Sequence, residues 1–202
     1  VLALAGQSAP VTGTAGMDIT FSTKGATSNA LASNLQAGGS VTLTKARVTG
    51  LDLADMVGGD ASANTLDDID ITTSFASLTS PMKAEGSVTW RGTRFAIAAN
   101  VDARPLLLGR DVPVTFNAKS DRVSIGFDGA ASLDGLGAGR ISLSTGSLRD
   151  LLAWIGQPLE AGRGLKAFSI AGNVKLTAYS FSFDNAAFTL DKSSGVGTGT
   201  LA

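Results

Sequence analysis

Apolar and small polar residues alternate along much of the chain, with the period of two residues that is typical of a strand with one dry face and one wet face. In the clearest early example, Met17, Ile19 and Phe21 alternate with polar residues. The pattern returns at 41–44, 69–75, 88–101, 112–127, 141–143 and 174–190. Because strands joined by short links pair with each other, it predicts an all-β fold, a long antiparallel meander that forms a curved or groove-like sheet of degenerate repeats.

Two short connections between these segments predict tight hairpins. Trp90 and Phe95 flank a four-residue stretch centred on Gly92, a residue that suits the left-handed backbone of a two-residue turn. The polar stretch 119–122 leads into Val123 and predicts a second hairpin. Both connections place consecutive strands side by side.

Three segments change to a helical period and predict short helices at the ends of the sheet. Residues 28–35 begin with a serine suited to capping and carry leucines four residues apart, and residues 51–57 are a weaker case of the same kind. The clearest segment is 147–155, where Ser147 is the expected N-cap and Gly156 the expected stop. We therefore expect two or three short helices.

The composition excludes several classes of function. The chain has 202 residues, a length that fits a single segment over 1–202 or two modules of about 1–66 and 67–202. Its net charge of -1 provides no basic excess for nucleic acid. It has no cysteine and no histidine, which excludes disulfides and mechanisms built on a thiolate or an imidazole. We therefore predict that it is not an enzyme and uses no cofactor or metal.

Two local patterns resemble ligand sites but are better explained by structure. The carboxylates at 67, 68 and 70 lack the spacing of a calcium loop, so we interpret them as a solvated strand edge. The glycine-rich stretches 135–140 and 195–199 lead into no helix and lack a Gly-Lys-Ser/Thr ending. We interpret both stretches as turns or strand kinks.

The apolar side of the predicted sheet is the remaining candidate site. It must either pack on a second layer or line a groove filled by something apolar, such as phospholipid acyl chains. No uninterrupted apolar run approaches the roughly 18 residues that span a bilayer. The predicted groove residues are Ile19, Phe21, Val41, Leu43, Val88, Trp90, Phe95, Ile97, Val114, Phe116, Ile125, Phe127, Ile141, Leu143, Phe181 and Phe183.

Several segments together resemble one family of bacterial envelope proteins. The strand 139–144 followed by the helical segment 147–156, with its sequence SLRDLLAWIG, resembles the AsmA family, which is related to TamB and other bridge-like lipid carriers. The segments 40–43 with 48–53, 164–172 and 188–191 continue the resemblance, which covers most of the chain from about Gly13 onward.

The resemblance to the AsmA family implies a periplasmic β-groove that shields phospholipid acyl chains in transport between the inner and outer membranes, and so contributes to outer-membrane biogenesis. It also implies an anchor in the inner membrane. We expect the anchor to lie outside this chain, which would make the chain an internal fragment, and other envelope proteins are possible partners. The alternative is a structural β-sandwich or solenoid module of a surface or adhesion protein, whose apolar face pairs internally.

Overall fold

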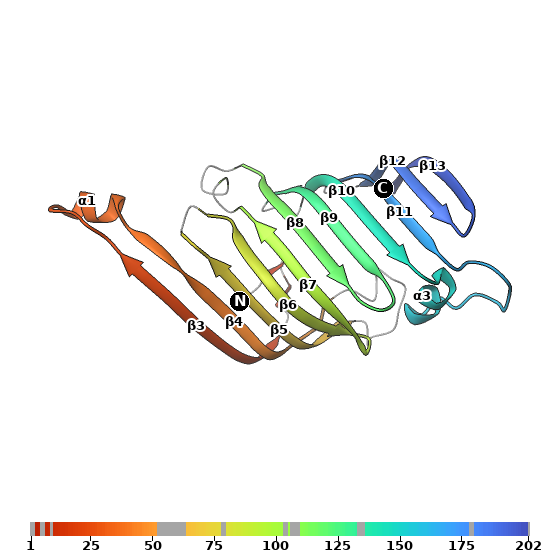
Figure 1. Ribbon diagram of the computed structural model, residues 1–202, viewed down its shortest axis with the longest axis horizontal. Helices are drawn as coiled ribbons and strands as arrows, with labels where there is room; N and C mark the ends of the chain where they lie inside the picture. Colours follow the sequence, from red (N-terminus) through yellow and green to blue (C-terminus); the bar gives the residue numbers. More distant parts are fainter. Residues whose placement is uncertain are drawn as a thin grey trace.

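One antiparallel sheet of eleven strands dominates the molecule (Figure 1). The computed structural model describes residues 3–4, 7–8, 10–51, 64–77, 80–102, 105, 110–132, 136–177 and 180–201. In chain order the strands of this sheet are β3 (Val11–Ser22), β4 (Gln36–Thr49), β5 (Thr65–Phe75), β6 (Met82–Trp90), β7 (Thr93–Val101), β8 (Val112–Lys119), β9 (Ser124–Ala131), β10 (Gly137–Thr145), β11 (Phe168–Leu176), β12 (Phe181–Leu190) and β13 (Ser193–Leu201).

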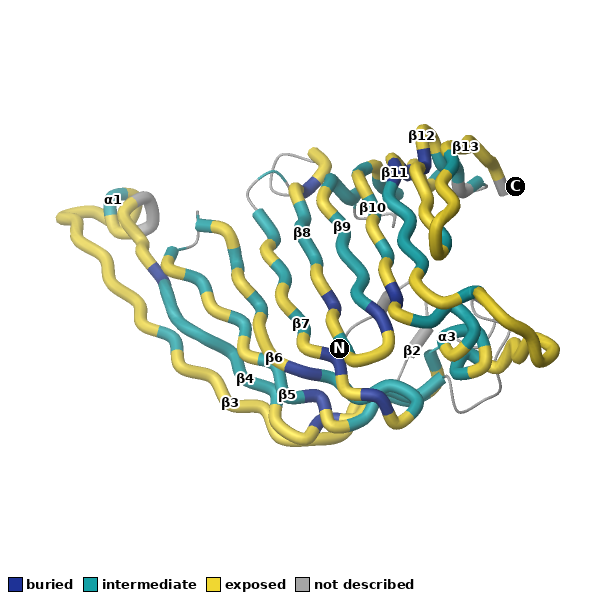
Figure 2. Tube along the Cα trace, turned by 45° about the vertical axis from the view of Figure 1, so that its right-hand side comes forward, coloured by how far each residue is buried: buried dark blue, intermediate teal, exposed yellow. Residues whose placement is uncertain are grey.

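Each strand of this sheet pairs with the next strand along the chain, so the predicted all-β meander is confirmed. The sheet is open, with β3 at one edge and β13 at the other. Figures 1 and 2 show that it is twisted and curved. The short strands β1 (Ala3–Leu4) and β2 (Gln7–Ser8) form a separate antiparallel pair. The division into two modules at about residue 66 stays a prediction.

Both predicted hairpins are confirmed. Between β6 and β7, Arg91 and Gly92 have φ angles of 47° and 72°, and two consecutive positive values are typical of the turn that matches the twist of paired strands. Between β8 and β9, the Ser120 hydroxyl accepts hydrogen bonds from the amides of Arg122 and Val123, at 3.2 and 3.1 Å. Local turn chemistry therefore sets the order of the central strands.

Two α-helices lie within the described residues, α1 (Ser28–Ser33) and α3 (Leu148–Trp154). Both occur where the helical period predicts them, with slightly shorter bounds. The Ser147 side chain accepts a hydrogen bond from the Asp150 amide at 3.2 Å, as expected of an N-cap. Of the weaker predicted helix at 51–57, residues 52–57 lie outside the described residues.

The strand register gathers apolar residues into rows across one side of the sheet, which we call the apolar face. Directly paired residues point to the same side, and so do residues two apart on one strand. One row contains Leu43, Ile71, Gly86, Ile97, Ala118, Ile125, Leu143, Ile170 and Phe188. The next row contains Met17, Val41, Thr73, Ala84, Ala99, Phe116, Phe127 and Ile141.

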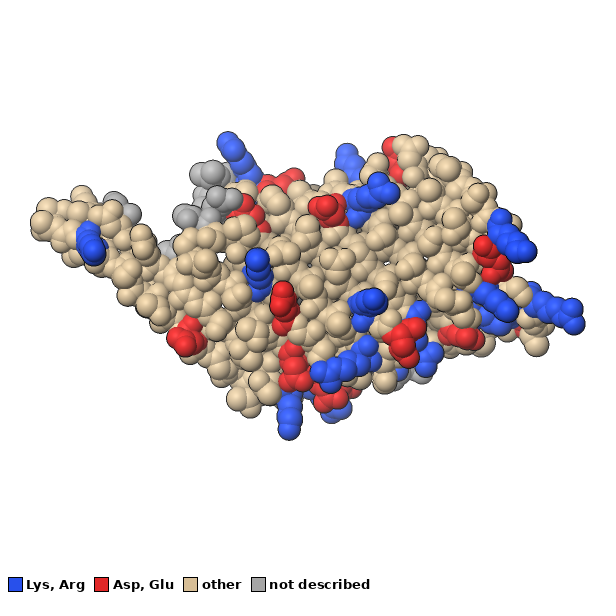
Figure 3. Space-filling model, in the orientation of Figure 1, with Lys and Arg blue, Asp and Glu red and all other residues tan. Residues whose placement is uncertain are grey.

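The charged residues of the sheet lie almost entirely on the side opposite the apolar face. Apart from Lys45 and Asp68, which lie in bulges with positive φ, every charged residue of the eleven strands points away from the apolar face. Figure 3 shows a face on which basic and acidic side chains are interspersed. The residues on this polar face are Asp18, Arg47, Asp67, Asp70, Lys83, Glu85, Arg94, Lys119, Asp128, Arg140, Lys175 and Asp184.

The molecule is thin for its mass. Its accessible surface is 13084 Å², whereas a compact globular protein of 20.3 kDa exposes about 8800 Å². Figure 2 shows buried residues only in short, separated stretches. The main buried cluster consists of Phe95, Ala118 and Val123, at the end of the sheet where α3 packs. The fold is therefore largely a single layer with a small local core.

Candidate functional site

The predicted groove residues share one side of the sheet. The register places fifteen of the sixteen on the apolar face. The sixteenth, Phe181, pairs with Leu176 in the ladder, and its side chain lies outside the described residues. Only Phe95 of the fifteen is buried, Phe21 is 65% exposed, and the other thirteen are partly exposed. The apolar face is thus accessible to solvent over most of its predicted residues.

Helix α3 packs on the apolar face near the β6–β7 and β8–β9 turns. The Trp154 ring meets the Trp90 ring edge to face, with centroids 5.0 Å apart, and lies 6.0 Å from the Phe95 ring. Its indole Nε1 donates a hydrogen bond to the Arg91 carbonyl at 3.2 Å, and the Arg122 guanidinium lies 6.0 Å from the ring centroid. Trp154 is therefore the main contact between α3 and the sheet.

A cavity of about 370 Å³ lies between α3 and the sheet. The described residues that line it are all apolar, if the indole nitrogens are set aside. Seven of them belong to the predicted groove, namely Val88, Trp90, Phe95, Ile97, Phe116, Ile125 and Leu143. The other six are Leu66, Ala118, Val123, Leu151, Trp154 and Ile155.

Sequence analysis predicted the helix at 147–155 but did not include any of its residues among the predicted groove residues, so it missed the contribution of α3 to this site. A signal was present in the helix itself. Leu148, Leu151, Leu152 and Ile155 form an apolar stripe on a segment of only seven helical residues. In an otherwise all-β chain, such a stripe has only the apolar side of the sheet to pack against.

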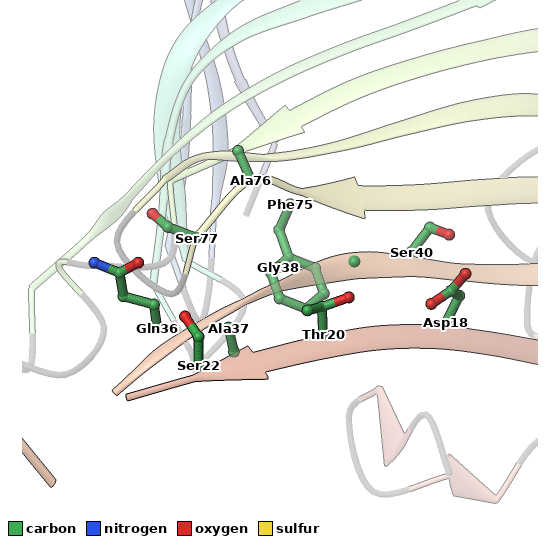
Figure 4. A pocket seen from close by; sticks show the side chains of 11 residues that line it. Asp18, Thr20, Ser22, Gln36, Ala37, Gly38, Ser40, Phe75, Ala76 and Ser77 are labelled. Carbon is green, nitrogen blue, oxygen red and sulfur yellow. The ribbon is translucent and has the colours of Figure 1, made fainter. Parts of the chain in front are cut away.

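A second hollow, of about 500 Å³, lies at the other end of the sheet (Figure 4). Asp18, Thr20 and Ser22 of β3 line it together with Gln36 and Ser40 of β4. Asp18 is the one ionisable group among its described lining residues. With a single carboxylate and no neighbouring acid or base, this hollow lacks the paired groups that general acid–base chemistry requires.

Two of the three carboxylates at 67, 68 and 70 have structural partners. Asp67 forms an ion pair with Arg47, and the Asp70 carboxylate accepts a hydrogen bond from the Lys45 amide at 2.9 Å. The interpretation of a strand edge is wrong, because β5 pairs with β4 and β6 and the cluster lies at a bulge of this interior strand. Within the described residues, no three histidine, cysteine, aspartate or glutamate side chains are grouped to hold a metal ion.

The glycine-rich stretches also belong to the sheet. Residues 137–140 lie in β10, which forms regular ladders with β9 and β11, and residues 195–199 lie in β13, whose ladder with β12 shifts register between Gly197 and Gly199. Neither described stretch precedes a helix in the way that a phosphate-binding loop does. Turns or strand kinks were predicted. Residues 137–140 instead form a regular strand, and residues 195–199 depart from a regular strand only at the register shift of β13.

The fold and the surface define a largely single-layered antiparallel sheet with one apolar face, which has no charged residue at the regular strand positions, and one charged polar face. No helix in the described part of the chain is both long and apolar enough to cross a bilayer. The chain matches no protein-family model, no curated protein and no solved structure. Its function must therefore be inferred from the two faces and the cavity under α3.

Proposed function

We propose that this chain holds phospholipid acyl chains against its apolar face, as a module of an AsmA-like protein of the bacterial periplasm. In this proposal the module contributes to lipid transport between the inner and outer membranes and to outer-membrane biogenesis. The observation that carries the proposal is the separation of the two faces. All twelve charged residues at regular strand positions lie on the face opposite Val41, Phe116 and Phe127.

The energetics favour a hydrocarbon ligand. Burying a methylene group contributes about 0.8 kcal/mol, so an acyl chain of about 16 carbons gains on the order of 10 kcal/mol when it is fully covered. An unpaired charge beside the chain would offset much of that gain. The apolar face provides no such charge at the regular strand positions, and it needs no catalytic group for the task.

The thin, open architecture also supports the proposal. Most apolar-face side chains keep partial solvent access, so a ligand can reach them without unfolding a second layer of the described chain. The polar face, with residues such as Lys83 and Glu85, can remain in water while the opposite face holds hydrocarbon. The inner-membrane anchor that we propose lies outside this chain, and other envelope proteins complete the assembly.

Photo-crosslinking from neighbouring positions tests the proposal. p-Benzoyl-phenylalanine is placed at Phe127 on the apolar face or at the adjacent Asp128 on the polar face, and the protein is incubated with vesicles of phosphatidylethanolamine and phosphatidylglycerol. We expect phospholipid adducts from Phe127 and almost none from Asp128, because adjacent strand residues point to opposite faces. Val114 and Thr115 provide a second matched pair on β8.

Equal crosslinking from both faces, or no lipid adduct from either, would contradict the proposal. Adducts from Phe127 that contain only protein would instead favour a structural module, whose apolar face is covered by another polypeptide. Mass spectrometry of the adducts separates these results directly.

A further inference from the structure

We propose that the cavity under α3 is a binding pocket for the methyl end of an acyl chain, with α3 as its outer wall. This inference rests on the proposed function. It adds that the part of the apolar face under α3 binds the end of the acyl chain. The pocket lies where Leu151, Trp154 and Ile155 face the sheet across the hollow.

The packing of α3 leaves room for a ligand. None of the residues of α3 is buried, although Leu151 and Trp154 of this helix line the cavity above the sheet. Leu151 and Trp154 pack around the cluster of Phe95, Ala118 and Val123 and yet remain partly exposed. A helix packed directly onto the sheet would bury its apolar residues, because protein interiors are normally close-packed.

The chemistry of the lining selects hydrocarbon. The Trp154 indole N–H is already bonded to the Arg91 carbonyl, so this ring presents apolar surface to the cavity. No other described lining residue of the cavity carries a polar side-chain group, apart from the indole nitrogen of Trp90. A phosphate or a carboxylate placed there would lose its hydration without compensation, which is strongly unfavourable.

The position of the cavity indicates which part of a lipid enters it. Phe116, Ile125 and Leu143 line the cavity, and Phe127 and Ile141 continue the apolar face two residues further along β9 and β10. A chain that lies on the apolar face therefore reaches the cavity without crossing a polar residue of these strands. Its volume of about 370 Å³ is at the lower end of the range for small-ligand pockets, which suits the end of a chain.

Tryptophan fluorescence provides a local reporter for this pocket. The chain has two tryptophans, Trp90 and Trp154, and both line the cavity. Phosphatidylcholine with a nitroxide near the methyl end of one acyl chain is compared with phosphatidylcholine labelled near the carboxyl end of that chain. Nitroxides quench indole emission at short range. At equal bound lipid, measured by electron paramagnetic resonance, we expect the methyl-end label to quench several-fold more strongly.

A matched pair of variants localises the effect. Leu143→Phe fills the cavity from β10, whereas Ile141→Phe makes a similar change on the same face two residues away, outside the cavity. We expect Leu143→Phe to abolish the excess quenching by the methyl-end label and Ile141→Phe to preserve it. If Leu143→Phe does not fold by circular dichroism, Leu151→Phe fills the cavity from α3.

The outcomes separate this inference from the proposed function. Equal quenching by the two labels, or stronger quenching by the carboxyl-end label, would overturn the pocket while lipid crosslinking at Phe127 still supports the apolar face. An absence of both bound label and crosslinks would overturn both. A parallel series with labelled free stearate shows whether the bound acyl chain belongs to a phospholipid or to a free fatty acid. Selective quenching by stearate alone would contradict a phospholipid as the occupant.

Discussion

The end of the sheet under α3 and the edge formed by β3 carry the same alternation of apolar and polar residues, but they differ sharply in burial. Phe95 in β7 is 4% exposed, whereas Phe21 in β3 is 65% exposed. Both lie on the apolar face. Phe21 lies on an edge strand with a neighbour on one side only, and α3, which brings Trp154 onto β6 and β7, has no counterpart on β3 among the described residues. Alternation therefore predicts the direction of both side chains, whereas their burial also depends on the place of the strand in the sheet and on a helix distant in sequence.

The largest expected change in stability concerns Trp154, and it tests whether α3 stabilises the part of the sheet on which it packs. We expect Trp154→Ala to lower the free energy of unfolding by about 3 kcal/mol, because it removes the ring contacts with Trp90 and Phe95 and the hydrogen bond to Arg91. Phe21→Ala should cost less than about 1 kcal/mol, because that ring is mostly exposed already. Urea denaturation monitored by circular dichroism measures both.

Similar losses of unfolding free energy for Trp154→Ala and Phe21→Ala would contradict the difference in burial between the two regions. In that case β3 would be covered in solution by something with which Phe21 packs, and the apolar face would not be open at that edge.

A smaller effect is expected where backbones approach closely in the sheet interior. A Cβ atom on Gly86 of β6 would lie 1.9 Å from the Asp70 carbonyl oxygen, whereas a Cβ on Gly197 of the edge strand β13 meets no atom within 4 Å. We expect Gly86→Ala to cost about 2 kcal/mol and Gly197→Ala to stay within about 0.5 kcal/mol of the parent chain. Thermal unfolding of the two variants checks this, and a large loss for Gly197→Ala would show that the β13 edge is covered.

The smallest expected difference compares the two helix caps. Ser147 caps α3, while the Thr27 hydroxyl accepts a hydrogen bond from the Ala30 amide at 3.2 Å at the start of α1, which lies beyond the end of the sheet (Figure 1). We expect Ser147→Ala to cost about 1 kcal/mol and Thr27→Ala less than about 0.5 kcal/mol, because fraying of α1 leaves the sheet intact. Hydrogen exchange should localise the Thr27→Ala effect to α1, and global destabilisation by this variant would contradict that view.

The sequence predicts the elements whose signals are local. Alternation predicts which side of the sheet Ile97 and Leu143 occupy, and the Arg91–Gly92 turn predicts a hairpin. Two features depend on distant residues and could not be predicted in the same way. Trp154 contacts the β6–β7 turn across 63 positions of sequence, so the apolar stripe of the helix indicates that it packs on the sheet but does not indicate the cavity between them. The bulge at Asp68 places an aspartate cluster inside the sheet, although its composition is typical of an edge.

The open sheet also sets the scale of what it can hold. Eleven strands about 4.8 Å apart give a width on the order of 50 Å across the ladder. The two leaflets of a bilayer together enclose a hydrocarbon layer about 30 Å thick, so one extended chain reaches about 15 Å. The sheet is thus roughly three times as wide as one such acyl chain is long. Under the proposed function, we expect several lipids to bind per protein, side by side across the strands, and the cavity under α3, at the β6–β7 and β8–β9 turns, to receive the end of one acyl chain.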